Sequence, residues 1–165
     1  LQGALTHMVC PAVMKICSFF CAGAVIYKTG SEYLHQLDGY GRRMPKVFII
    51  FTVSGFALMG VPGLCGFIGK WSLASAAVES GMPLAYAGIG ALLISAILTA
   101  IYMCSVSVRA FFPGKSFDYS TIAHVEDPSW LMVLPLVLFT VAMFVLGLHP
   151  QGLLEVIREA VTPLL

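Results

Sequence analysis

The chain has 165 residues, of which 59% are hydrophobic and only 10% charged, and its formal net charge at pH 7 is +1. Because a soluble domain is about half apolar and about a quarter charged, this composition excludes an ordinary soluble protein. The small net charge also gives no electrostatic reason to expect nucleic acid as a partner. The sequence therefore predicts an integral membrane protein.

Four stretches are apolar over the length of about 20 residues that a helix needs to cross a bilayer. The predicted spans lie at about 3–27, 45–80, 82–110 and 129–148. Since lipid offers no hydrogen-bond partner to backbone N–H and C=O groups, segments of this length must be helices. The expected fold class is an all-α polytopic membrane protein, with a single membrane domain over residues 1–165.

The first span carries a lysine near its middle, in the stretch LTHMVCPAVMKICSFFCAGAVIY. A charge at the bilayer centre costs about 2.5–3.5 kcal/mol, so Lys15 is expected to face the interior of a helix bundle and to mark an ion or proton path. His7 precedes Lys15 by two helical turns, and Pro11 between them weakens the helix. Lys15 is the main proton-relay candidate of this span, while His7 is either a further polar station or an ordinary interfacial group.

Lysine and arginine residues gather in two of the connections between the spans. Residues 28–46 and 109–128 both contain them, whereas the connection ESGMP between the second and third spans has none. Because positively charged loops stay on the cytoplasmic side, loops 28–46 and 109–128 are predicted to be cytoplasmic. Both ends of the chain are then expected on the opposite face.

A second lysine follows a stretch rich in glycine and proline, GVPGLCGFIGKWSLA. In one interpretation the span ends here, and Lys70 with the following tryptophan forms an interfacial anchor. In the other, the segment from Pro45 to about Ser80 is too long for one straight crossing and is broken at Pro62 and Gly63, which places Lys70 inside the membrane. The residue pattern alone leaves both interpretations open.

The later segments contain weaker signals. Ser95, Thr99 and Tyr102 fall at helical spacing along the third span, where they either line a water path or serve helix packing. Residues 150–162 place apolar side chains opposite two glutamates, which predicts a short helix on the membrane surface or a frayed chain end.

No feature of the sequence indicates a cofactor or an enzymatic site. All five cysteines lie within the predicted spans, and neither C-x-x-C nor Cys/His metal spacing occurs. Ligand sets for flavin, haem or iron–sulfur clusters are not visible, and neither are paired carboxylates or a nucleophile motif. We therefore expect no metal, no cofactor and no catalytic residue in this chain.

Two stretches resemble a known family. GALTHMVCPAVMKICSFFCAGAVIYKTG resembles the family's H-x-x-x-H-x-x-x-K span, and GRRMPKVFIIFTVSGFALMGVPGLCGFIGKWSL is similar to its pattern of M-P, a long apolar run, G-[IV]-P-P-x-x-G-F-x-[SG]-K and a second half-helix. The family comprises the antiporter-like, proton-conducting membrane subunits of respiratory complex I (NADH-quinone oxidoreductase), membrane-bound hydrogenases and Mrp-type cation/proton antiporters. His7 matches its first histidine and Lys15 its lysine, whereas Pro11 replaces its second histidine and Gly63 its second proline.

The resemblance implies a fold and a set of roles. The chain would correspond to the last four helices of a fourteen-helix antiporter-like fold, with the second segment broken at Pro62 and Lys70 as a proton-binding residue. Protons would pass along Lys70, Lys15 and His7. The expected location is a bacterial or archaeal cell membrane, and the expected partners are the lipid bilayer, other membrane subunits of the complex and protons, with sodium as the further ion of an antiporter.

Under this interpretation, redox chemistry belongs to other subunits of the complex. An alternative class is a non-conducting structural module, or a truncated fragment, that packs against partner subunits. The two differ in whether the buried lysines carry protons.

Overall fold

The computed structural model describes residues 2–114 and 117–162, which form helices and their connections without any strand. The elements are α1 (Gln2–Thr29), the 3₁₀ helix η1 (Leu34–Leu37), α2 (Tyr40–Arg43), α3 (Pro45–Met59), α4 (Cys65–Glu79), α5 (Pro83–Phe111), α6 (Trp130–Leu148) and α7 (Gln151–Val161). The predicted all-α class is confirmed.

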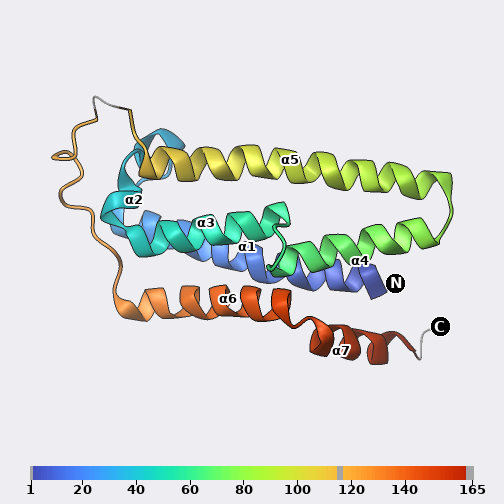
Figure 1. The fold of residues 1–165 in the computed structure, drawn as a ribbon. Helices are drawn as coiled ribbons and strands as arrows, with labels where there is room; N and C mark the ends of the chain where they lie inside the picture. The colour runs from blue at the N-terminus through green and yellow to red at the C-terminus, as the bar shows by residue number, and fades with distance from the viewer. Residues whose placement is uncertain (1, 115–116, 163–165) are drawn as a thin grey trace.

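The long helices lie alongside one another, as Figure 1 shows. α1 packs against α3, α4 and α6, while α5 covers α3 and α4 on the side away from α1. The connections at 30–44 and 112–129 share one end of the bundle, and the described ends of the chain lie at the other (Figure 1). The two basic loops therefore lie at the same end, as the orientation prediction requires, although the side of the membrane they occupy stays a prediction.

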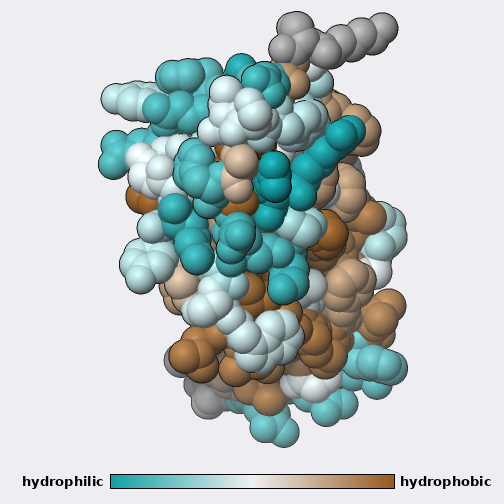
Figure 2. Space-filling view, turned by 90° about the vertical axis from the view of Figure 1, so that its left-hand side faces the viewer, coloured by the Kyte–Doolittle hydropathy of each residue, from teal (hydrophilic) through white to brown (hydrophobic). Residues whose placement is uncertain are grey.

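The surface separates into polar and apolar zones. Figure 2 looks onto the end that carries the two basic connections, where hydrophilic residues gather, whereas hydrophobic residues cover the flanks. α5 is mostly exposed and presents large apolar side chains along its length, including Leu84, Leu93, Ile97 and Ile101. A polar end and apolar flanks are the distribution that a bilayer requires of a bundle crossing it.

Three helices, α1, α5 and α6, are long and apolar enough to cross a membrane. The second predicted span is instead divided between α3 and α4, which have 15 residues each. At 1.5 Å per residue each half is only about 22 Å long, less than the hydrocarbon core of about 30 Å. The helix expected over 45–80 is thus interrupted at residues 60–64, where the sequence predicted a break, whereas a single membrane crossing by the two halves stays a prediction. Lys70 lies beyond the break, in a half-helix that continues to Glu79.

Glycine and proline explain why the helix stops here. Gly60 closes α3 in the left-handed region with φ +96°, and Gly63 also has a positive φ of +90°. Pro62 between them lacks the N–H that a continuing helix would need. A Cβ added to Gly66 would overlap the carbonyl oxygen of Ala57, so the first turn of α4 packs directly on the last turn of α3.

The C-terminal segment forms the predicted amphipathic helix, α7. Ile157 and Val161 are buried, whereas Glu155 and Glu159 on the opposite face are exposed. The helix packs near the first turn of α1, where the side-chain amide of Gln2 donates a hydrogen bond to the Leu154 carbonyl at 3.4 Å. Its position on a membrane surface stays a prediction.

The polar end of the bundle contains an ion pair and a half-buried carboxyl. Arg109 at the end of α5 donates to Asp38 at 3.0 Å. Asp127, just before α6, is partly buried, and this burial raises the pKa of its carboxyl, although Lys46 acts in the opposite direction. The ion pair ties the end of α5 to the connection between α1 and α3.

Candidate functional site

Lys70 lies in the second turn of α4, and its side chain extends back to the end of α3. Its ammonium group donates hydrogen bonds to the carbonyl oxygens of Leu58 at 2.8 Å and Met59 at 2.7 Å. The side chain is partly buried. The lysine therefore bridges the two halves of the broken helix.

The last turn of a helix leaves four carbonyl groups without an intrahelical donor. At the end of α3 the N–H groups of Gly60 and Val61 serve two of them, those of Phe56 and Ala57. The remaining two bind Lys70. These carbonyls form the negative end of the α3 dipole, which favours a cation by about 0.3–1 kcal/mol in exposed settings and more when shielded from water.

No carboxylate serves as the counter-charge of Lys70 within the part of the chain that the structure describes, where the only ion pair joins Arg109 and Asp38. The negative, carbonyl end of half-helix α3 serves as the counter-charge of Lys70 instead. An ammonium group has three N–H donors. Two of them bind the carbonyls, and the third has no hydrogen-bond partner among the described residues.

His7 faces α4 from the second turn of α1. A Cβ added to Gly69 would lie 3.2 Å from the His7 Cα and 3.4 Å from Nδ1, so the absence of a side chain at position 69 lets the two helices approach closely. His7 Nδ1 is buried and has no hydrogen-bond partner among the described atoms. The imidazole lies near enough to Lys70 and Lys15 for both charges to act on it.

Lys15 lies two turns further along α1 and is exposed on the surface of the described bundle. Its neighbours on that face include the exposed apolar residues Met8, Ile16 and Phe19. The sequence predicted that Lys15 would face a bundle interior, and the described helices do not enclose it. The structure thus brings His7 next to Lys70 and within electrostatic range of Lys15, without a direct hydrogen bond between any two of the three.

Pro11 lies inside α1, which continues through it without a break. A helical N–H at position 11 would bond the carbonyl of residue 7, and proline has no N–H. The backbone carbonyl of His7 is therefore left without its usual donor. Pro11 stands where the resembling family has its second histidine, and it leaves the backbone carbonyl of His7 free to accept a hydrogen bond.

Two hydroxyl contacts between helices were not anticipated from the sequence. Ser18 of α1, one turn beyond Lys15, lies 2.8 Å from the fully buried Ser54 of α3. Thr52 of α3 donates to Ser107 of α5 at 2.9 Å. Isolated serines in an apolar span give no sequence signal that separates such a pair from ordinary back-bonded hydroxyls.

The predicted water-path residues of α5 lie apart from this cluster. Ser95 and Tyr102 are exposed, and the Thr99 hydroxyl donates to the Ser95 carbonyl at 2.7 Å within the same helix. Nothing in the structure connects them to Lys70, and their lining role stays a prediction. Pro62 and Gly63 occupy the break itself, with Gly63 facing Leu148 of α6.

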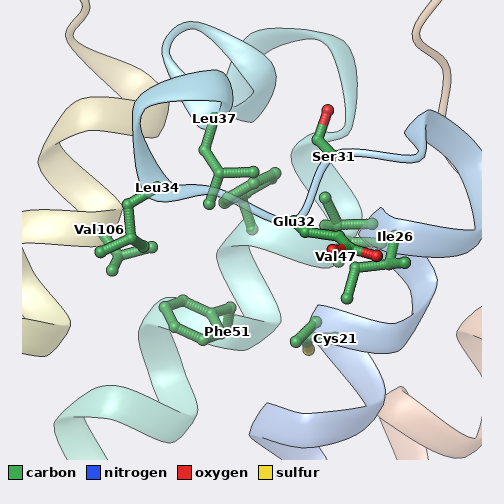
Figure 3. Close-up of a pocket in the computed structure, with 12 residues that line it drawn as sticks. Cys21, Ile26, Ser31, Glu32, Leu34, Leu37, Val47, Phe51 and Val106 are labelled. Carbon is green, nitrogen blue, oxygen red and sulfur yellow. The ribbon is translucent and has the colours of Figure 1, made fainter.

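A separate apolar cavity of about 180 Å³ lies near the end of α1 that carries the loops, between α1, α3 and η1. Figure 3 shows Cys21, Val47 and Phe51 lining it beneath Leu34 and Leu37 of η1, with Glu32 at its edge. Its wall is almost entirely apolar, so it offers no proton path. In the described residues, no three His, Cys, Asp or Glu side chains are grouped to hold a metal ion.

The architecture is that of a membrane-embedded helical bundle with a discontinuous helix and a lysine at the break. The family model described as "NADH:quinone oxidoreductase/Mrp antiporter, TM" matches residues 1–95. The chain therefore belongs to this family.

Several known proteins are similar to this chain over most of its length. The chain is 26% identical to NADH-quinone oxidoreductase subunit N of Desulforudis audaxviator, over 99% of this chain and 34% of that protein. It is 31% identical to NADH-quinone oxidoreductase subunit L of Rickettsia conorii, over 89% of this chain and 22% of that protein. It is 29% identical to F(420)H(2) dehydrogenase subunit N of Methanosarcina mazei, over 97% and 33%.

The fold is also found in a solved structure. A chain in the Mrp complex from Dietzia sp. DQ12-45-1b superposes with a TM-score of 0.75 at 21% identity, over 95% of this chain and 36% of that chain. This likeness shows the shared fold. The chain spans about a third of the length of these relatives or less.

Proposed function

We propose that this chain belongs to a proton-translocating, antiporter-like membrane subunit of a complex I-like, Mrp-type or membrane-bound hydrogenase complex. The observation that carries the proposal is the Lys70 ammonium held by two carbonyls at the end of a broken helix. Family membership and the shared fold support it. The partners are then other membrane subunits of that complex.

The geometry at Lys70 suits proton exchange at the third N–H position of its ammonium group. When the third N–H gives up its proton, the neutral amine keeps both N–H bonds to Leu58 and Met59. Its lone pair then points where the lost proton was, ready to accept the next one. The two carbonyls hold the nitrogen in place through both protonation states, so little reorganisation accompanies the transfer.

His7 and Lys15 extend this site along α1. Like charges repel, so a proton that arrives on one group favours release from its neighbour. The charges of both lysines act on His7, which supports a role for the imidazole as a relay between them. Because no hydrogen bond joins the three side chains, water must bridge them, and the His7 carbonyl left free by Pro11 is one acceptor for such a water.

The membrane face with which Lys70 would exchange protons follows from the predicted orientation. With loops 28–46 and 109–128 in the cytoplasm of a bacterial or archaeal cell, the break and Lys70 lie toward the outer half of the crossing. Lys70 would then exchange protons with the outer face and Lys15 would act as the central relay. Sodium is a second ion to test in exchange for protons.

The experiment is proton uptake into vesicles that contain the full-length parent complex, at equal amounts of assembled protein. We expect Lys70→Ala and Lys15→Ala each to abolish uptake, whereas Lys28→Ala, at the exposed end of α1, retains it. Uptake that survives in both Lys70→Ala and Lys15→Ala would instead identify a non-conducting module that packs against partner subunits.

A further inference from the structure

The residue that ends α3 also forms one wall of the Lys70 site. Gly60 has φ +96° and ψ 39°, a left-handed conformation that side chains other than glycine adopt at a cost. A Cβ at this position would lie 3.1 Å from Lys70 Cδ and 3.5 Å from Lys70 Nζ. Position 60 therefore favours glycine for two reasons, its left-handed backbone and the tight contact that a Cβ would make with the Lys70 side chain.

The turn at Gly60 also decides which carbonyls Lys70 can reach. It directs the N–H groups of residues 60 and 61 back onto the last turn of α3, where they occupy two of the four open carbonyls. The carbonyls of Leu58 and Met59 remain for the ammonium group. A chain that left the helix in another direction would expose a different set of acceptors.

We propose that Gly60 is a positioning residue for the proton on Lys70, which it places by leaving space for the lysine side chain and by reserving two carbonyls for its ammonium group. This inference rests on the proposed role of Lys70 as a proton carrier. It goes beyond that role because it assigns the geometry of the carrier to a residue with no side chain.

The charged surroundings of Lys70 explain why its position matters. From α1 the titratable neighbour is His7, on which the charge of Lys15 also acts. From α3 Lys70 meets two backbone carbonyls, and it forms no ion pair within residues 2–114 and 117–162. A methyl group at position 60 would press on Lys70 Cδ, which must give way by a few tenths of an ångström, and so shift the side chain that carries the nitrogen to those carbonyls.

The test compares Gly60→Ala with Gly81→Ala in the assembled full-length complex. Gly81 follows α4, has a positive φ of +64°, and a Cβ there would meet nothing within 4 Å, so it controls for backbone strain alone. Gly60→Asn is a second variant, because asparagine tolerates a left-handed conformation better but keeps the Cβ. The measurements are proton uptake across a pH series and the unfolding temperature.

We expect both Gly60 variants to lower proton uptake at least fivefold and to shift its pH profile, while Gly81→Ala stays within twofold of wild type with an unchanged profile. Gly60→Ala should also lower the unfolding temperature. In the Lys70→Ala background we expect this fall to be at most half as large, because the lysine side chain that the new methyl group would press on is then absent. Gly60 variants with the uptake and profile of Gly81→Ala would overturn the inference.

The two proposals fail in different ways. If Lys70→Ala abolishes uptake while Gly60→Ala behaves as Gly81→Ala does, the role of Gly60 is wrong and that of Lys70 stands. If Lys70→Ala retains uptake, the carrier role is wrong. In that case the unfolding temperatures still decide whether Gly60 positions the lysine side chain. If Gly60→Ala lowers the unfolding temperature equally in the wild type and in Lys70→Ala, the positioning role is wrong as well.

Discussion

Lys70 has two separable tasks in this structure, since it caps α3 and is proposed to carry a proton. Lys70→Met removes both hydrogen bonds and leaves the carbonyls of Leu58 and Met59 without a donor. Hydrogen bonds to a charged group contribute about 1.5–3 kcal/mol each, so the pair contributes about 3–6 kcal/mol where no water can replace it. Because water drawn to the two unpaired carbonyls can replace part of these bonds, we expect a loss of about 2–4 kcal/mol in the free energy of unfolding.

Lys70→Gln separates the two tasks. Its side-chain amide keeps N–H donors, although it is one bond shorter than lysine, and it has no group that accepts a proton near neutral pH. We therefore expect Lys70→Gln to recover part of the stability that Lys70→Met loses, while both variants abolish proton uptake. Stability is measured as the unfolding temperature of the solubilised parent complex, and uptake is measured in vesicles.

Lys28→Met is the matched control, because Lys28 lies at the exposed end of α1. If Lys70→Met unfolds at the same temperature as Lys28→Met, the two carbonyl bonds contribute nothing and the capping argument is refuted. If Lys70→Gln translocates protons at the wild-type rate, Lys70 is no carrier.

Three further predictions concern packing and charge. Gly66→Ala places a Cβ onto the α3 backbone, and we expect it to cost at least about 3 kcal/mol, seen as loss of assembled complex on native gels. The hydroxyl oxygens of Ser18 and Ser54 lie 2.8 Å apart. The double variant Ser18→Cys, Ser54→Cys should therefore form a disulfide with copper phenanthroline and lose two thiols that react with maleimide. The control double variant Ser18→Cys, Ser95→Cys should lose none. Burial raises the pKa of Asp127, so the folded state binds this proton more tightly and stability falls as the pH rises through the raised pKa. Asp127→Asn should remove that fall from unfolding temperatures measured between about pH 4 and pH 7, and a wild-type slope in the variant would contradict it.

The helices could be predicted from the sequence because lipid leaves few choices. An apolar run of sufficient length must be a helix, and the bounds of α1, α5 and α6 lie within two residues of the expected ranges. The glycines and proline between Met59 and Cys65 made a break one of two interpretations, and the resemblance to the family, rather than the residue pattern, favoured it. What the pattern left open was whether Lys70 belonged to the end of a span or to its interior.

The contacts of the site could not be predicted, because each depends on how two distant segments pack. The bonds from Lys70 to α3 arise only after α4 folds back against the end of the half-helix, and the approach of His7 depends on Gly69, which the sequence analysis passed over. Ser18 and Ser54 lie 36 positions apart and meet through the packing of α1 on α3. Periodicity identifies the face of a helix, but not the residue of the neighbouring helix that it meets.

The two lysines differ in a way that bears on how the site works. Lys70 is held by backbone carbonyls that this chain itself supplies, so its protonation is tied to the shape of the α3–α4 break. Lys15 makes neither a hydrogen bond nor an ion pair within the described residues and is exposed on α1. Because a charge facing lipid at that depth is costly, and because the relatives are about three times as long as this chain, we expect their other segments to cover Lys15. Lys70→Met should then destabilise the α3–α4 break locally, whereas Lys15→Met should abolish proton uptake with little effect on that break. The rate of maleimide labelling of Val61→Cys, measured in each of the two variants, reports how far the break has opened.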